Sequence, residues 1–161
     1  MKNKFQVIVV GGGHAGMEAA YISARMGVDT ALISLSKAHI GLMPCNPSIG
    51  GLGKGHIVYE VSALGGLMPQ LCNSTYLQAR MLNTSKGPAV QGLRLQIDKY
   101  AYKEKAQEVL GQTDHLTIIE GMVDGFNLIE QDGKRAIAGV WVTQDGNRVY
   151  YEADAVVVTA G

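Results

Sequence analysis

The first part of the chain alternates between short apolar runs and one longer amphipathic stretch. Residues 5–10 are apolar and rich in β-branched side chains except at Gln6, which is typical of a strand buried on both faces of a sheet. Residues 15–26 predict a helix that ends at Gly27, and residues 28–33 predict a second buried strand. A strand, a helix and a second strand within about 30 residues indicate a βαβ unit.

The middle of the chain begins with a long stretch that has no hydrophobic period. Residues 34–55 are rich in glycine, and so long an irregular segment is typical of a functional loop. After it we expect a short helix over residues 56–64 and a longer helix over about residues 93–110. Residues 116–119 are short and apolar, and they predict a third strand of the main sheet.

The last third has the pattern of an antiparallel meander. The Asp-Gly dipeptides at residues 132–133 and 145–146 are strong hairpin signals. They separate three strand-like runs, at residues 123–129, 136–143 and 147–151. One more buried strand is expected at residues 155–159, and a chain that stops directly after it is expected to be cut short. The pattern predicts an α/β fold, a Rossmann-like domain with a parallel sheet, a βαβ start and a three-stranded meander, truncated at its C-terminal end.

Composition narrows the classes of protein only a little. A length of 161 residues suits one domain, and 14 basic against 14 acidic residues give no global field that points to nucleic acid or membrane. The N-terminus lacks a signal-peptide pattern and no apolar run is long enough to span a bilayer, so we expect a soluble cytoplasmic protein. Cys45 and Cys72 do not form a disulfide framework, and the irregular spacing of His39, His56 and His115 predicts no metal site.

The first loop matches the pattern G-x-G-x-x-G at Gly11, Gly13 and Gly16, with Ala20 one turn further on. Gly11 permits a tight turn out of the strand, and Gly13 lets the backbone approach phosphate oxygens. Gly16 and Ala20 let the helix pack closely on the sheet, and the helix N-terminus offers free N–H groups to a pyrophosphate. Because a predicted strand precedes the motif and a predicted helix follows it, the loop indicates a dinucleotide site.

The acidic residue that usually holds the adenosine ribose is absent. Counted from the glycine loop, its place falls at Ser34, and no Asp or Glu lies between Asp29 and Glu60. We therefore expect a hydroxyl or backbone groups to hold the ribose, which argues against an ordinary dehydrogenase.

Two other nucleotide-related classes fit the sequence poorly. Residues 41–56 suggest a Walker phosphate loop, but Ser48 stands where the motif needs glycine and Gly55 where it needs a hydroxyl. A flavin disulfide reductase would need two cysteines close together after the second strand, whereas Cys45 and Cys72 lie far apart.

Five blocks of sequence together resemble the glucose-inhibited division protein A family, whose members are FAD-dependent enzymes. They are residues 11–16, 45–47, 49–56, 63–68 and 82–90. Members of this family install carboxymethylaminomethyl groups on the wobble uridine of tRNA, and the family carries a hydroxyl residue where Ser34 stands. The resemblance covers the whole chain, which is expected to be the N-terminal part of an FAD/dinucleotide-binding domain spanning residues 1–161.

The resemblance also implies cofactors and partners. FAD, replenished by NADH, takes part in transferring a one-carbon unit from methylenetetrahydrofolate to C5 of the uridine. A GTPase of the same pathway and tRNA are the implied partners, full-length members are homodimers, and no membrane is involved. The NAD-binding and C-terminal helical tRNA-binding regions of the family are absent from this chain.

The glycine motif and the resemblance together assign a set of residues to FAD. They are Gly11, Gly12, Gly13, His14, Ala15, Gly16, Ser34, Asn46, Lys86, Val123 and Gly161. Cys45 matches a family cysteine proposed to act in the chemistry, and a thiol near Lys54 and His56 in sequence fits a lowered pKa. A buried packing role for Cys45 remains the alternative.

Two further alternatives stay open. Six basic residues fit either a contact with the tRNA backbone or a solvated helix face: Arg80, Lys86, Arg94, Lys99, Lys103 and Lys105. The chain fits either the FAD-binding part of a tRNA-modifying enzyme or a non-catalytic flavin-binding fragment, with a generic FAD-dependent oxidoreductase as a weaker third reading. In either case, we expect the 161-residue chain alone not to modify tRNA.

Overall fold

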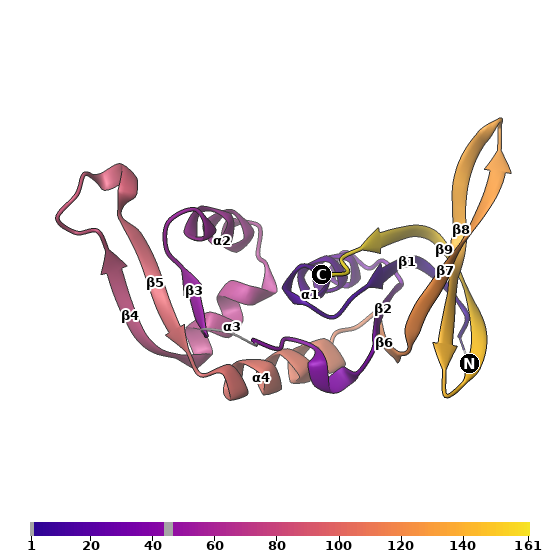
Figure 1. The fold of residues 1–161 in the computed structure, drawn as a ribbon, viewed down its shortest axis with the longest axis horizontal. Helices are drawn as coiled ribbons and strands as arrows, with labels where there is room; N and C mark the ends of the chain where they lie inside the picture. The colour runs from indigo at the N-terminus through magenta and orange to yellow at the C-terminus, as the bar shows by residue number, and fades with distance from the viewer. Residues whose placement is uncertain (1, 44–46) are drawn as a thin grey trace. The chain divides into compact units, whose positions relative to one another are not determined.

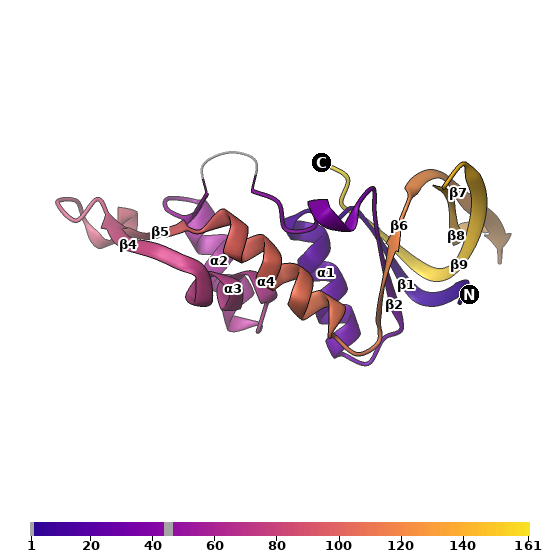
Figure 2. The same cartoon turned by 90° about the horizontal axis from the view of Figure 1, so that it is seen from below.

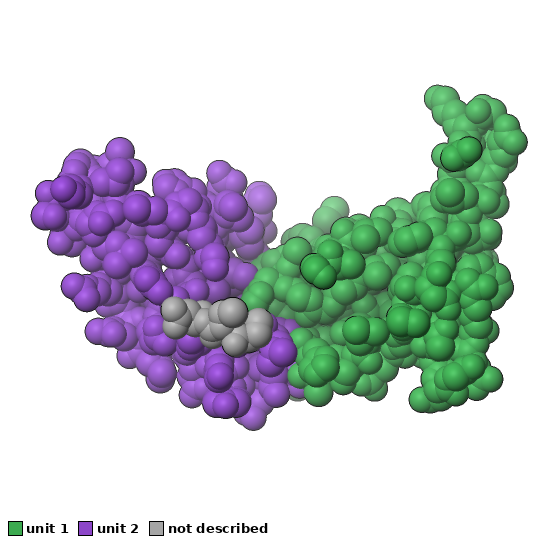
Figure 3. Space-filling view, in the orientation of Figure 1, with its two compact units in different colours: residues 1–40, 109–161 green, residues 41–108 purple. Residues whose placement is uncertain are grey.

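The computed structural model describes residues 2–43 and 47–161. These residues form two compact units (Figure 3). Unit 1 comprises residues 1–40 and 109–161, and unit 2 comprises residues 41–108. The helix α4 (Lys99–Gly111) runs across the boundary between them.

Unit 1 is built on a six-stranded mixed sheet. In spatial order its strands are β6 (Leu116–Glu120), β2 (Thr30–Ser34), β1 (Lys4–Val10), β9 (Asn147–Val158), β8 (Lys134–Gln144) and β7 (Met122–Gln131). The first four strands pair in parallel, whereas β9, β8 and β7 pair antiparallel (Figure 1). The predicted α/β class, the βαβ start and the meander are confirmed.

The two strands expected at residues 147–151 and 155–159 are one continuous strand, β9. It pairs antiparallel with β8 up to Glu152 and parallel with β1 from Glu152 onward, so Glu152 belongs to both pairings. The prediction of a buried strand at its end was also wrong, because Val157 and Val158 are both exposed. An apolar run records what the chain can bury, and only the neighbouring elements decide whether it does.

The helix α1 (His14–Arg25) packs against the strands of unit 1 (Figure 2). It buries Met17, Ala20 and Ala24, and it ends just before Gly27, whose φ of +78° favours glycine. The core of the sheet is a cluster around Phe5, Ile8, Ala31, Ile33, Ile119, Val140, Val142, Tyr151 and Ala153. This packed core holds the ends of β1, β2 and β9 in fixed register.

Unit 2 combines helices with a small antiparallel sheet. Its elements are β3 (Ser48–Gly50), α2 (Lys54–Ala63), α3 (Leu67–Thr75), β4 (Tyr76–Leu82) and β5 (Gly92–Ile97), and the strand order is β3-β5-β4. Two short 3-10 turns complete the chain, η1 (Lys37–His39) in unit 1 and η2 (Pro88–Val90) in unit 2. The helix predicted at residues 56–64 is confirmed as α2, whereas α3, β3 and β4 were not predicted.

The long helix predicted over residues 93–110 was wrong in its first turn and a half. Residues 92–97 form β5, and α4 begins only at Lys99. The alternation of Leu93, Leu95 and Ile97 with polar residues has the period of a strand. Asp98 then starts the helix, because its carboxylate accepts the N–H groups of Tyr100 and Ala101 at 3.0 and 3.1 Å. Among the described residues, no helix is long and apolar enough to span a membrane.

Candidate functional site

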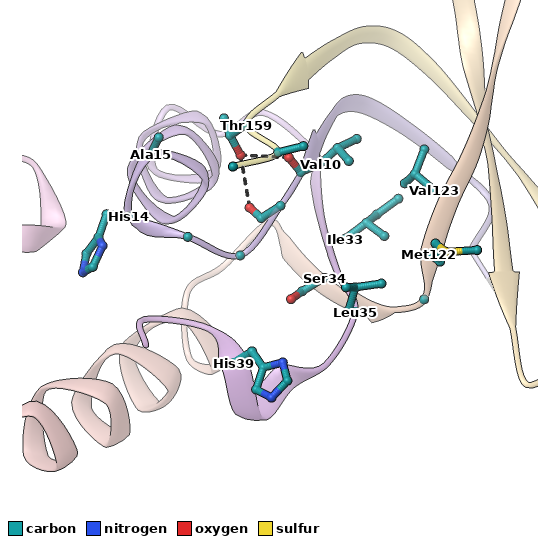
Figure 4. A pocket seen from close by; sticks show the side chains of 16 residues that line it. Val10, His14, Ala15, Ile33, Ser34, Leu35, His39, Met122, Val123 and Thr159 are labelled. Carbon is teal, nitrogen blue, oxygen red and sulfur yellow. Dashed lines mark hydrogen bonds between the residues drawn. The ribbon is translucent and has the colours of Figure 1, made fainter. Parts of the chain in front are cut away.

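A pocket of about 580 Å³ opens at the carboxyl ends of the parallel strands of unit 1 (Figure 4). This volume lies within the usual range of small-molecule sites. Its walls come from the loop after β1, the end of β2, the start of β7 and the end of β9. The lining residues are Val10, Gly11, Gly12, Gly13, His14, Ala15, Ile33, Ser34, Leu35, His39, Gly121, Met122, Val123, Thr159, Ala160 and Gly161. In α/β sheets this edge is where ligands bind.

The loop after β1 leaves no room for side chains at its key positions. Gly11 has a φ of +110°, and a Cβ there would lie 2.8 Å from the carbonyl oxygen of Thr159. A Cβ at Gly12 would meet the hydroxyl of Ser34 at 2.8 Å, and one at Gly16 would overlap the carbonyl oxygen of Gly11. The glycines therefore let loop, helix and sheet approach one another closely.

Thr159 fastens this loop to the last strand of the sheet. Its hydroxyl lies 2.8 Å from the carbonyl oxygen of Val10, to which it donates, and 3.2 Å from that of Gly11 (Figure 4). The backbone N–H of Thr159 also donates to Val10 at 2.9 Å. Sequence reasoning did not single out Thr159, because its partner lies some 150 positions earlier in the chain and only strand pairing brings them together.

The start of α1 provides the positive end of the pocket. Gly13 is the N-cap and has no side chain to occupy the free N–H groups, and the first turn contains no acidic residue. The first N–H groups of a helix have no partner within it, so they are available to an anion. A Cβ at Gly13 would meet nothing within 4 Å, which leaves this side of the loop open.

Ser34 lies at the end of β2 and is 7% exposed. Its hydroxyl donates to the carbonyl oxygen of Ser36 at 3.1 Å, so its oxygen still has lone pairs that can accept a hydrogen bond from a ribose hydroxyl. The carboxylate of Glu120 does lie near Ser34, but it belongs to the neighbouring strand β6. Glu120 pairs in register with Ser34 and accepts the N–H of Lys37 at 2.7 Å, which caps η1.

The remaining wall is apolar and suits a flat aromatic ring. Met122 and Val123 from β7 line it together with Ile33 and Leu35 (Figure 4). The imidazole rings of His14 and His39 lie at the rim on the side away from Val123 (Figure 4). His39 was considered in the sequence only as a metal ligand, and nothing in its spacing indicated a place in this pocket.

The structure brings together most of the residues predicted to bind FAD. Nine of the eleven lie in unit 1, and of these only Gly16 lies behind the pocket, buried under the loop; the other eight line it: Gly11, Gly12, Gly13, His14, Ala15, Ser34, Val123 and Gly161. Lys86 belongs to unit 2, where it is exposed in the loop between β4 and β5. Asn46 and the predicted catalytic Cys45 lie outside the described residues. Within residues 2–43 and 47–161, no group of His, Cys, Asp or Glu could hold a metal ion.

The matches to related proteins cover nearly all of this chain. The tRNA uridine 5-carboxymethylaminomethyl modification enzyme MnmG of Zymomonas mobilis is 47% identical over 161 residues, which are 100% of this chain and 25% of that protein. The enzyme of the same name from Granulibacter bethesdensis is 50% identical over 98% of this chain and 24% of its own length. The chain thus spans about a quarter of the curated relatives that it matches.

A solved structure agrees with these relatives. Aquifex aeolicus GidA superimposes with a TM-score of 0.88 and 44% sequence identity over 99% of this chain and 25% of its own. The model of the family described as Glucose inhibited division protein A matches residues 6–161. The glycine loop, the pocket and these matches give one conclusion: the chain belongs to the glucose inhibited division protein A family.

Proposed function

We propose that the chain is the FAD-binding part of an enzyme that modifies the wobble uridine of tRNA. The observation that carries the proposal is the pocket of unit 1, where three glycines, a helix N-terminus and an apolar wall surround one cavity. Relatives that are nearly half identical carry the name of this tRNA modification, which supports the substrate class.

Different parts of the pocket fit the pyrophosphate, the ribose and the adenine of a flavin dinucleotide. A pyrophosphate needs donors without competing carboxylates, and the start of α1 offers N–H groups with no acidic residue in the first turn. A ribose needs an acceptor, for which Ser34 is placed at the end of β2. Gly121, Met122 and Val123 line the pocket and would offer backbone groups and apolar contacts to the adenine.

When bound, FAD would supply two-electron redox chemistry. The residues of this chain would bind the cofactor and hold its adenosine half. Gly11, Gly12 and Gly13 would let the backbone approach the phosphates, and Thr159 would keep that loop in place through its contacts with Val10 and Gly11. The sheet behind the loop excludes water from one side, because Ile8, Val9 and Ile33 are almost fully buried.

The finer parts of the proposal come from the family resemblance. NADH would reduce the flavin, methylenetetrahydrofolate would donate the one-carbon unit, and a GTPase would work with a homodimer of the full-length protein in the cytoplasm. Lys86 and Asn46 would add contacts to the flavin. Cys45 would act in the chemistry, in which case Cys45→Ser should leave FAD binding unchanged while abolishing modification by a full-length enzyme that carries the substitution.

A titration of the purified chain with FAD, and separately with FMN, tests the cofactor. We expect saturable quenching of FAD fluorescence and no saturable binding of FMN, because FMN lacks the pyrophosphate and adenosine that the pocket is shaped to hold. A cooperative thermal transition would establish that the chain is folded. Equal binding of both flavins, or no binding of FAD by a folded chain, would contradict the proposal.

A further inference from the structure

The small sheet of unit 2 has two faces of opposite character. Ile49, Leu93 and Leu95 lie on one face, where they line a small cavity with residues of α2 and α3. Residues directly opposite one another on antiparallel strands share a face. The register therefore places Ser48, Gln78, Arg80, Arg94 and Gln96 together on the other face, which we call the arginine face.

Two cations lie side by side at the centre of the arginine face. Arg80 of β4 and Arg94 of β5 are direct partners in the register, and both are exposed. Like charges directly opposite one another on neighbouring strands are destabilising when nothing neutralises them. Arg94 is further held in place by a hydrogen bond from its Nη2 to the hydroxyl of Ser48 at 2.9 Å.

Among the residues that the structure describes, no carboxylate forms an ion pair with Arg80 or Arg94. The chain from Arg80 to Gln96 contains three basic residues and no Asp or Glu. The ion pairs found among the described residues use Lys2, Lys4, Lys105 and Arg148. The polar neighbours on the face, Gln78, Gln96 and Ser48, can all donate hydrogen bonds. An exposed surface of paired guanidinium groups and neutral donors is complementary to a polyanion.

We infer that the arginine face of unit 2 binds the phosphodiester backbone of tRNA. The inference rests on the proposed function, which supplies the polyanion, and it assigns a surface to that substrate. Residues opposed across two antiparallel strands have Cα atoms about 5 Å apart, so the two guanidinium groups can grip one phosphate or two successive ones. Because such contacts involve no bases, the face positions the RNA and does not read its sequence.

The test compares two double variants that lose the same charge. Arg80→Gln with Arg94→Gln removes the arginine pair, whereas Lys134→Gln with Arg135→Gln removes two exposed cations from the hairpin of β7 and β8 in unit 1. Binding of an unmodified tRNA transcript to the chain is measured at several salt concentrations. We expect the first variant to bind about tenfold more weakly at low salt, with a slope of log K against log salt smaller by about 1.5. The second variant should change affinity by less than about twofold.

A gain of charge keeps the test independent of folding defects. Gln96→Lys adds a cation beside Arg94 and should tighten tRNA binding by about threefold at low salt. Lys86 stays unchanged in every variant, because it is a candidate flavin contact. An unchanged salt slope in the arginine variant, equal losses in both double variants, or no tRNA binding by a chain that binds FAD would overturn the inference.

The FAD titration separates this inference from the proposed function. FAD affinity should be the same in all variants, since none of the substituted residues lines the pocket of unit 1. A chain that binds tRNA through the arginine face but binds no FAD would overturn only the cofactor proposal. A chain that binds FAD and ignores these substitutions when it binds tRNA would overturn only the arginine face.

Discussion

Unit 1 and unit 2 each contain a glycine-rich segment, but the glycines do different things. At Gly11, Gly12 and Gly16 of unit 1, an added Cβ would meet backbone or packed side-chain atoms at close range. In residues 50–55 of unit 2, only Gly50 is so placed, against the carbonyl oxygen of Leu93, while Gly53 faces open space. A count of glycines therefore does not identify a ligand loop. A ligand loop is identified by close packing behind it, combined with open space and free N–H groups in front of it.

The largest effect is expected from Gly16→Ala. The new Cβ would overlap the carbonyl oxygen of Gly11, so the helix and the loop must separate. We expect the free energy of unfolding to fall by about 3 kcal/mol and FAD binding to be lost. Thermal denaturation and flavin titration measure the two losses. Gly13→Ala is the matched control, because its Cβ meets nothing but would enter the space proposed for the phosphates. It should weaken FAD binding with less than about 0.5 kcal/mol change in stability.

The next largest effect compares a packed glycine, Gly50, with an open one, Gly53, within unit 2. In Gly50→Ala a Cβ would overlap the carbonyl oxygen of Leu93, and the φ of +93° is itself unfavourable for alanine, so we expect a cost of about 3 kcal/mol. Gly53→Ala has open space and a φ of +75°, which leaves only a backbone cost of about 1–2 kcal/mol. Hydrogen exchange of the amides of residues 47–108 measures both. Equal costs would show that packing around Gly50 does not matter.

A smaller effect is expected from Thr159→Val, which removes the hydroxyl but keeps the shape. Loss of its hydrogen bonds to Val10 and Gly11 should cost about 1 kcal/mol and weaken FAD binding by about fivefold, because the loop is then less firmly positioned. Thr159→Ser keeps the hydroxyl and should retain most of the affinity. If valine and serine behave alike, the hydroxyl does not hold the loop.

The smallest effect concerns Asp124 in the meander of unit 1, which does not itself line the pocket. Hydrogen bonds from Thr143 and Arg148 lower the pKa of the Asp124 carboxyl below its usual value. A lowered pKa means that the stabilisation is present above the unfolded-state pKa of about 4 and disappears as the pH falls through the folded-state value. We therefore expect Asp124→Asn to lower the melting temperature slightly near pH 7, with the difference from the parent chain vanishing once the pH falls below the folded-state pKa. A difference that persists in acid would assign the effect to packing.

Much of unit 1 could be predicted, because its signals are local. The apolar run of β1, the G-x-G-x-x-G spacing and the helix α1 lie within residues 4–25, and each element has the period or the glycines that its geometry requires. The Asp-Gly turns of the meander are local as well, and Asp132 and Asp145 indeed adopt positive φ. Unit 2 was largely missed, since its short β3 and exposed β4 lack a strong hydrophobic period.

The sequence by itself determined the loop chemistry, the class of fold and the family, because these depend on residue types at fixed short spacings. The tertiary structure alone decided that Thr159 would hold the loop, that Glu120 would cap η1 beside Ser34, and that Arg80 would face Arg94. These partners are 14 to 149 positions apart. Such pairs are fixed by strand register, which forms only when whole elements pack, and no local pattern of polar and apolar residues records it.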